Sequence, residues 1–209
     1  MKGTDSGINS TIGITGGIGA GKSVISRVLR CNGLNVYDCD REAKLIMVND
    51  QSVKNSLTDR LGKDVYLTDG NLNRGKLAED IFSDHELRRF VNGIVHKAVR
   101  NDIEEKRKKI EGLFFIESAI LVTGGIAPLC NKIWIVTAPI AERITRVIKR
   151  DNTDIISVEK RMKSQERELE LLESKDIVVL ENDNRNPLLE EILKMTDKLN
   201  YQQTYSISC

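Results

Sequence analysis

A glycine-rich pattern of the form G-x-x-x-x-G-K-[ST] is met by Gly16-Gly17-Ile18-Gly19-Ala20-Gly21-Lys22-Ser23. The run before it, Thr11-Ile12-Gly13-Ile14-Thr15, is short and β-branched and predicts a buried strand. After it, apolar side chains recur at helical spacing until Gly33, at Val24, Ile25, Val28 and Leu29. A strand, a glycine loop and a helix in this order form a phosphate cradle. The chain is therefore expected to bind a nucleoside triphosphate.

Each part of this loop has an expected role. Backbone N–H groups are expected to surround the phosphate oxygens, assisted by the positive end of the helix. These groups belong to Gly17, Ile18, Gly19, Ala20 and Gly21. Lys22 would reach the β- and γ-phosphates, and the hydroxyl of Ser23 would ligate Mg²⁺.

Five apolar runs predict strands, and helical patterns separate them. The runs are 12–15, 34–37, 113–116, 133–137 and 177–180. This alternation predicts an α/β fold like that of the P-loop NTPases, a five-stranded parallel sheet flanked by helices. Ligands bind beyond the carboxyl ends of such strands. Function is therefore expected where the glycine loop, Asp38-Cys39-Asp40 and Glu117 follow their strands.

Two segments are too long to be simple connections. Residues 41–112 predict a helical insert over an acceptor substrate, and residues 143–173 predict a lid region. The expected insert helices cover 41–47, 52–61, 77–82 and 87–107. Together these segments belong to one domain over 11–200, between a polar leader at 1–10 and a C-terminal tail at 201–209.

The composition excludes several classes of protein. The formal net charge is only +1, whereas a dedicated nucleic-acid binder has a clear basic excess. No apolar run reaches the roughly 18 residues of a membrane span. Four cysteines stand far apart without metal-ligand spacing, which favours a reducing, cytoplasmic setting. No feature implies an obligate protein partner.

Asp38 and Asp40 are the candidates for activating an acceptor hydroxyl. Both follow a strand that ends beside the expected phosphates, where a carboxylate can accept a proton or order the water around a metal. The alternative for Asp40 is that it only caps the helix that begins at Arg41. Either carboxylate could serve as the base.

Arginines supply the positive charge that phosphoryl transfer requires. Arg143, Arg146 and Arg150 are spaced to share one helix face, which suits closure on a phosphoryl group. The alternative is a solvated basic face. Glu117 is expected near the metal or the acceptor, or else as a strand end bonded to backbone.

Several further motifs accompany the loop in a fixed order. They are Asp38-Cys39-Asp40, Asp69-Gly70-Asn71-Leu72-Asn73-Arg74, Asn92 with His96, Arg146 to Asp151 followed by Gln165, and Asn182. As a set, the motifs resemble the dephospho-coenzyme A kinase family from about Thr11 to Met195. The family patterns are T-G-G-I-x-S-G-K-[ST], D-x-D, D-G-x-L-[ND]-R, L-N-x-x-x-H-P and R-x-x-x-R-D.

The resemblance implies a reaction. ATP would phosphorylate the ribose 3′-hydroxyl of dephospho-coenzyme A, with Mg²⁺ as cofactor, to give coenzyme A and ADP. Asp40 would be the likelier base, and Arg146 and Arg150 would neutralise the moving group. Asn182 would lie near the adenine. The acceptor side would be formed by Arg74, Asn92, His96 and Glu117.

The sequence departs from the family pattern on the acceptor side. Lys97 stands where a proline is usual, and Thr123 stands where the segment D-x-P-L-L-F-E ends in an acid. Neither change touches the glycine loop.

Two other functions share the loop. A kinase for another small hydroxyl compound would have the same loop and lid. A nucleotide-driven switch would hydrolyse ATP or GTP without an acceptor. A guanine-specific switch should show N-K-x-D at a strand end, whereas Asn131-Lys132-Ile133-Trp134 lacks the aspartate.

Overall fold

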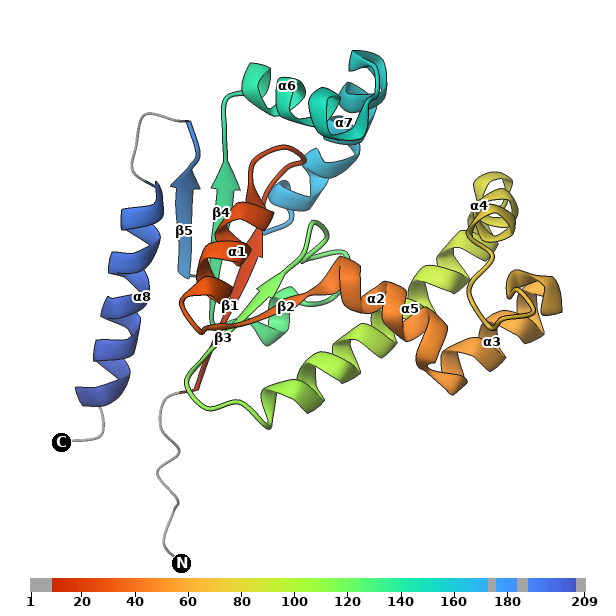
Figure 1. The fold of residues 1–209 in the computed structure, drawn as a ribbon, viewed down its shortest axis with the longest axis horizontal. Helices are drawn as coiled ribbons and strands as arrows, with labels where there is room; N and C mark the ends of the chain where they lie inside the picture. The colour runs from red at the N-terminus through yellow and green to blue at the C-terminus, as the bar shows by residue number, and fades with distance from the viewer. Residues whose placement is uncertain (1–8, 173–175, 184–187, 206–209) are drawn as a thin grey trace, which may run out of the picture. The chain divides into compact units, whose positions relative to one another are not determined.

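The computed structural model describes residues 9–172, 176–183 and 188–205, with a five-stranded sheet at the centre. The strand order is β2-β3-β1-β4-β5 (Figure 1). The strands are β1 (Ser10–Thr15), β2 (Asn35–Asp38), β3 (Leu113–Glu117), β4 (Lys132–Thr137) and β5 (Asp176–Glu181). All five expected strands are present, and the expected α/β fold is confirmed. Only the second strand is displaced, by one residue.

Strand β1 pairs in parallel with both neighbours and forms the middle of the sheet. Its register with β3 runs from Ser10 opposite Leu113 to Ile14 opposite Glu117. With β4 it runs from Ile12 opposite Lys132 to Thr15 opposite Ile135. All of β1 after Ser10 is buried, because the sheet is covered on both faces. The glycine loop therefore starts from the buried central strand of the sheet.

Aromatic and aliphatic side chains fill the core around β1. Phe115 and Trp134 are fully buried, and their ring centroids lie 5.3 Å apart. Ile25 and Leu29 bring the apolar face of α1 (Lys22–Cys31) onto this core. The described helices that follow β3 along the chain are the short η2 (Ala127–Leu129), α6 (Ile140–Asp151), α7 (Ile155–Glu170) and α8 (Leu188–Tyr205).

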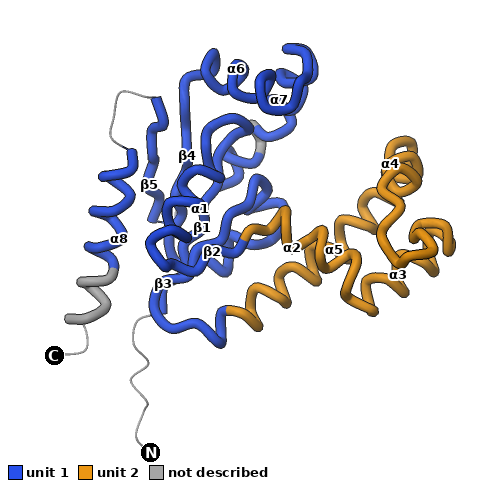
Figure 2. Tube along the Cα trace, in the orientation of Figure 1, with its two compact units in different colours: residues 1–37, 107–209 blue, residues 38–106 orange. Residues whose placement is uncertain are grey.

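The chain divides into two compact units (Figure 2). Residues 1–37 and 107–209 form unit 1, and residues 38–106 form unit 2. Unit 2 is helical: α2 (Cys39–Asn49), α3 (Gln51–Leu61), η1 (Lys63–Val65), α4 (Arg74–Ser83) and α5 (His85–Arg107). Residues 1–8 of the expected leader, residue 173 of the expected lid region and residues 206–209 of the expected tail lie outside the described residues. Helix α8 extends into the expected tail.

Polar side chains set the ends of the helices in unit 2. Asp38 accepts a hydrogen bond from the N–H of Arg41 at 3.0 Å, and Asp50 accepts one from Val53 at 3.0 Å. These carboxylates satisfy N–H groups that have no partner inside a helix. Because α2 begins at Cys39, its cap is Asp38. The alternative that Asp40 is the cap is therefore wrong.

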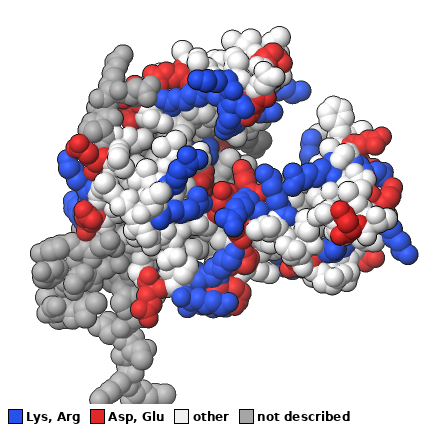
Figure 3. All heavy atoms as spheres, in the orientation of Figure 1, with Lys and Arg blue, Asp and Glu red and all other residues white. Residues whose placement is uncertain are grey.

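Positive and negative side chains are mixed on the face of the protein that Figure 3 shows. That pattern agrees with the formal net charge of +1. None of the helices in the described part of the chain is long and apolar enough to cross a membrane.

A glycine at position 16 is required by the backbone, and its replacement tests the fold. Gly16 has φ +144°, and an added Cβ would lie 2.1 Å from the carbonyl oxygen of Val136 in β4. Gly16→Ala is expected to lower the free energy of unfolding by more than about 2 kcal/mol, from strain and overlap.

Gly33→Ala is the matched control, because Gly33 has φ +77° but nothing within 4 Å of an added Cβ. It should cost only about 1 kcal/mol, for the left-handed conformation. Urea unfolding of the two variants measures the difference. Equal losses would show that the contact with β4 is unimportant.

Candidate functional site

The loop from Gly16 to Gly21 connects β1 to α1 and leaves the start of α1 open. Gly21 is the N-cap residue, in the left-handed conformation at φ 107°, and no side chain caps the helix. The first turn of α1 contains no acidic residue. The helix end therefore has N–H groups that no side chain caps and a partial positive charge, which together favour an anion.

Lys22 and Ser23 are the first two residues of α1. The Lys22 ammonium donates hydrogen bonds to the carbonyl oxygens of Gly16 at 2.6 Å and Gly17 at 3.3 Å. Its positive charge thus lies directly against the loop. The Ser23 side chain is exposed in the same helical turn.

The backbone of Ile18 is held from both sides by α6 and α7, the helices of the expected lid region, called the lid helices below. Its N–H donates to Gln165 Oε1 of α7 at 2.7 Å, and its carbonyl accepts from Arg143 Nε of α6 at 3.0 Å. A Cβ at Gly17 would lie 2.0 Å from Arg143 Nη2. The guanidinium group therefore rests on the glycine backbone, and the loop conformation depends on α6 and α7.

Arg146 and Asn182 hold the next part of the loop. Arg146 donates to the carbonyls of Gly19 at 3.4 Å and Asn182 at 3.0 Å, and it pairs with Glu142 at 2.7 Å. Asn182 Nδ2 donates to the carbonyl of Ala20 at 2.8 Å. The structure thus brings Arg146 and Asn182 together with the loop.

Arg150 has a different partner from the other two arginines of α6. It forms two hydrogen bonds with Asp151, at 2.7 and 3.0 Å, and Arg161 contacts the same carboxylate at 2.7 Å. Hydrogen bonds from Arg150 and Arg161 lower the pKa of Asp151 to about 2. Asp151 is therefore ionised near neutral pH, and the pair persists. Of the three arginines, Arg143 and Arg146 contact the glycine loop.

The carboxylates expected at the site come from the ends of β2 and β3 and the start of α2. Glu117 ends β3 and is half-buried. In unit 2, Asp38 ends β2 and caps α2, whereas Asp40 is exposed in the first turn of α2. The two aspartates are therefore not equivalent, because the Asp38 carboxylate already has a structural role.

The residues expected on the acceptor side lie in unit 2. Arg74 begins α4 and lines a hollow of about 200 Å³. The other lining residues are Lys44, Met47, Val48, Asn71 and Leu72. Asn92 and His96 lie one turn apart on α5, exposed and half-buried respectively. Lys97 lines a separate groove with Asp50, Asp102 and Glu105.

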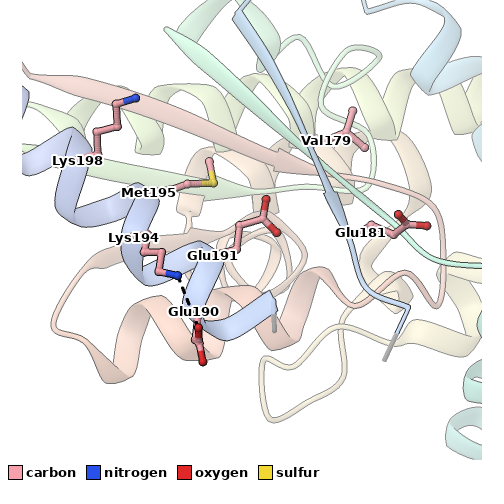
Figure 4. A pocket seen from close by; sticks show the side chains of 7 residues that line it. All are labelled: Val179, Glu181, Glu190, Glu191, Lys194, Met195 and Lys198. Atoms are coloured by element: carbon pink, nitrogen blue, oxygen red, sulfur yellow. Dashed lines mark ion pairs between the residues drawn. The ribbon is translucent and has the colours of Figure 1, made fainter. Parts of the chain in front are cut away.

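A larger hollow, of about 600 Å³, lies between β5 and α8 (Figure 4). Val179 and Glu181 line it from β5, and Glu190 pairs with Lys194 at 3.6 Å on α8. None of its lining residues belongs to the glycine loop or to the lid helices. Its size therefore does not make it the candidate phosphate site.

The sequence did not predict the backbone contacts that three residues of unit 1 form. Arg143 was only one of three arginines on a helix face, and Gln165 was matched by its position in the family pattern. Glu168 of α7 gave no signal, although it is 5% exposed and accepts hydrogen bonds from Val122 and Thr123. A glutamate in a highly charged helix is ordinarily solvated.

Comparison with known proteins agrees with this arrangement. A family model described as dephospho-CoA kinase matches residues 10–187. A dephospho-CoA kinase from Porphyromonas gingivalis is 44% identical over 162 residues, which cover 77% of this chain and 80% of the relative. One from Bacteroides fragilis strain YCH46 is 36% identical over 186 residues, covering 88% and 90%.

Solved structures share the fold of this chain. The crystal structure of TT1252 from Thermus thermophilus has a TM-score of 0.74 at 32% identity, over 90% of this chain and 96% of that one. Shikimate kinase from Acinetobacter baumannii has a TM-score of 0.52 at 11% identity, over 94% and 96%, a likeness of fold alone. The resemblance inferred from the motifs is confirmed, and the chain belongs to the dephospho-CoA kinase family.

Proposed function

We propose that this chain transfers the γ-phosphoryl group of ATP to the ribose 3′-hydroxyl of dephospho-coenzyme A. The products are coenzyme A and ADP, in the last step of coenzyme A synthesis. The observation that carries the proposal is the glycine loop at the uncapped start of α1, with Lys22 against it, in a chain of this family. Such a loop positions phosphates, which is most of what phosphoryl transfer requires from a protein.

The triphosphate is bound by backbone and by one ammonium group. Backbone N–H groups between Gly17 and Ser23, other than that of Ile18, which Gln165 accepts, surround the phosphate oxygens. Lys22 exchanges its bonds to loop carbonyls for bonds to the β- and γ-phosphates. Asn182 contacts the adenine base; the support is its family motif and its position beside the loop, where its amide donates to the carbonyl of Ala20.

The residues present fit a magnesium ion with few protein ligands. The exposed hydroxyl of Ser23 is a hard oxygen donor, and Mg²⁺ keeps several waters beside one or two protein ligands and substrate phosphates. Among the described residues, no three His, Cys, Asp or Glu side chains cluster as a metal site. Glu117 orders the water around the ion. When bound, Mg²⁺ neutralises charge on the β- and γ-phosphates.

Asp40 orients the acceptor hydroxyl and accepts its proton, and Asp38 assists. The support is the capping role of Asp38, which leaves Asp40 as the exposed carboxylate of the D-x-D motif. A carboxylate within hydrogen-bond reach of the hydroxyl is sufficient for this step.

Arginines and the helical unit complete the site. Arg146 and Arg150 neutralise the phosphoryl group as it moves, and Arg146 already contacts the loop at Gly19. Lys44 and Arg74 line one hollow, and two cations suit the diphosphate of dephospho-coenzyme A. Asn92 and His96 contact the remainder of the acceptor.

We also propose that the protein acts in the cytoplasm, without an obligate protein partner. Cys31, Cys39 and Cys130 are free thiols, which persist in a reducing compartment. A small-molecule acceptor needs no second chain.

The first test measures ADP release from Mg·ATP with and without dephospho-coenzyme A. We expect release that depends on the acceptor, and a product whose mass has increased by one phosphate. ADP release that ignores the acceptor would favour a nucleotide-driven switch. Binding of ATP without turnover in either case would indicate a kinase for another hydroxyl compound.

The second test replaces the proposed base. Asp40→Asn keeps the shape of the side chain but cannot accept a proton, so kcat should fall roughly 100- to 10,000-fold while ATP still binds. Asp59→Asn is the control, because Asp59 is an exposed aspartate of the same helical unit. Calorimetric ATP binding and steady-state rates separate the two effects. Full turnover by Asp40→Asn would rule out Asp40 as the base.

A further inference from the structure

A buried carboxylate joins α7 to the loop that follows β3. Glu168 is 5% exposed, and it accepts hydrogen bonds from the N–H groups of Val122 and Thr123 and from the Thr123 hydroxyl. The distances to Thr123 are 3.1 Å from its nitrogen and 2.7 Å from its oxygen. In the described part of the chain, these donors, rather than a lysine or arginine, are its partners.

Burial makes this contact a strong constraint. A carboxylate leaves water only where its oxygens are satisfied, and N–H and O–H donors to a charged acceptor form short, strong bonds. The helix and the loop therefore cannot separate unless the loop N–H groups and the carboxylate lose partners together.

The same loop packs on the strand that leads into the glycine loop. Leu121 is fully buried, and a Cβ at Gly13 of β1 would lie 2.8 Å from Leu121 Cδ2. At the start of the loop, the N–H of Ser118 donates to the carbonyl of Ile14 at 3.0 Å. Glu168 is thus connected through residues 118–125 to β1.

A second contact comes from the same face of α7. Gln165 lies three residues before Glu168, so the two side chains share a helix face. Gln165 accepts the N–H of Ile18 in the glycine loop. One face of α7 therefore contacts the glycine loop directly and holds its supporting strand through the 118–125 loop.

We propose that Glu168 is a positioning residue for phosphoryl transfer, which with Gln165 fixes the lid helix α7 on the nucleotide site. The inference rests on the proposed function. Thr123 and Glu168 form a matched pair, since Thr123 supplies a donor where the family pattern has an acid. A second carboxylate at position 123 would face Glu168 and repel it.

The consequence concerns the fate of the γ-phosphoryl group. A fixed lid excludes water, so the acceptor oxygen is the only nucleophile at the γ-phosphorus. As it bonds to that phosphorus, the bond between the γ-phosphorus and the β-phosphate oxygen breaks. A loosened lid admits water as the competing nucleophile. Its oxygen then takes the phosphoryl group, and the products are ADP and inorganic phosphate.

The test measures ADP and phosphorylated acceptor in the same reaction. Wild type and the control Glu170→Ala, an exposed glutamate of the same helix, should give about one ADP per phosphorylated acceptor. Glu168→Ala should form product roughly 10- to 100-fold more slowly and release excess ADP. Glu168→Gln should recover most activity, because its amide oxygen still accepts the loop N–H groups.

The pairing of Thr123 with Glu168 is tested by placing a carboxylate at position 123, with and without the one at position 168. Thr123→Glu should behave like Glu168→Ala, because two carboxylates then face each other. The double variant Thr123→Glu/Glu168→Gln should recover part of the activity, because the amide donates to the new carboxylate. These variants also decide the question if Glu168→Ala does not fold.

Three results separate the possibilities. Product formation that slows while one ADP still accompanies each product would make Glu168 merely structural and overturn the inference. Identical behaviour of Glu168→Ala and Glu170→Ala would overturn it too. Wild type without any acceptor phosphorylation would instead reject the proposed function itself.

Discussion

The glycine loop contains peptide groups that neither β1 nor α1 can hydrogen-bond, and side chains from distant parts of unit 1 supply their partners. Gln165 accepts the N–H of Ile18, Arg143 donates to the Ile18 carbonyl, and Arg146 and Asn182 donate to the carbonyls of Gly19 and Ala20. A buried peptide group without a partner is costly. The cradle is therefore shaped by tertiary contacts as much as by its glycines.

This constraint links nucleotide binding to the lid. Arg143 and Arg146 come from α6, and Gln165 comes from α7. The helix that supplies positive charge to the loop and its neighbour α7 therefore set the loop conformation together. A displacement of α6 or α7 would change the hydrogen-bond partners of the Ile18 backbone. A loop with fixed N–H groups binds phosphate without reorganising, which lowers the cost of reaching the transition state.

Local sequence patterns predicted the strands and the glycine loop, because burial and glycine conformation are properties of short segments. The cap of α2 was not predictable in the same way. Whether Asp38 or Asp40 caps depends on the residue at which the helix begins: the sequence favoured Arg41, whereas α2 begins at Cys39. The spacing predicted that Arg150 shares a helix face with Arg143 and Arg146. It did not predict that the Arg150 side chain bonds to Asp151, the next residue in the chain.

Glu168 shows where sequence reasoning ends. Nothing in a charged helix distinguishes a glutamate that is solvated from one that is buried against a loop 45 residues earlier. Its contacts depend on the tertiary fold, which brings Val122 and Thr123 beside it. The departure at Thr123 from the family pattern then has a physical reason, because the carboxylate at this contact comes from α7.

Hydrogen exchange at the Ile18 amide, followed by NMR, tests most directly whether the lid shapes the loop. Without nucleotide, this amide should exchange slowly in wild type, because it donates a hydrogen bond to Gln165. In Gln165→Ala it should exchange roughly tenfold faster or more, while the Ile25 amide, bonded to Gly21, stays unchanged. Equal exchange of the Ile18 amide in both proteins would contradict a loop held by the lid.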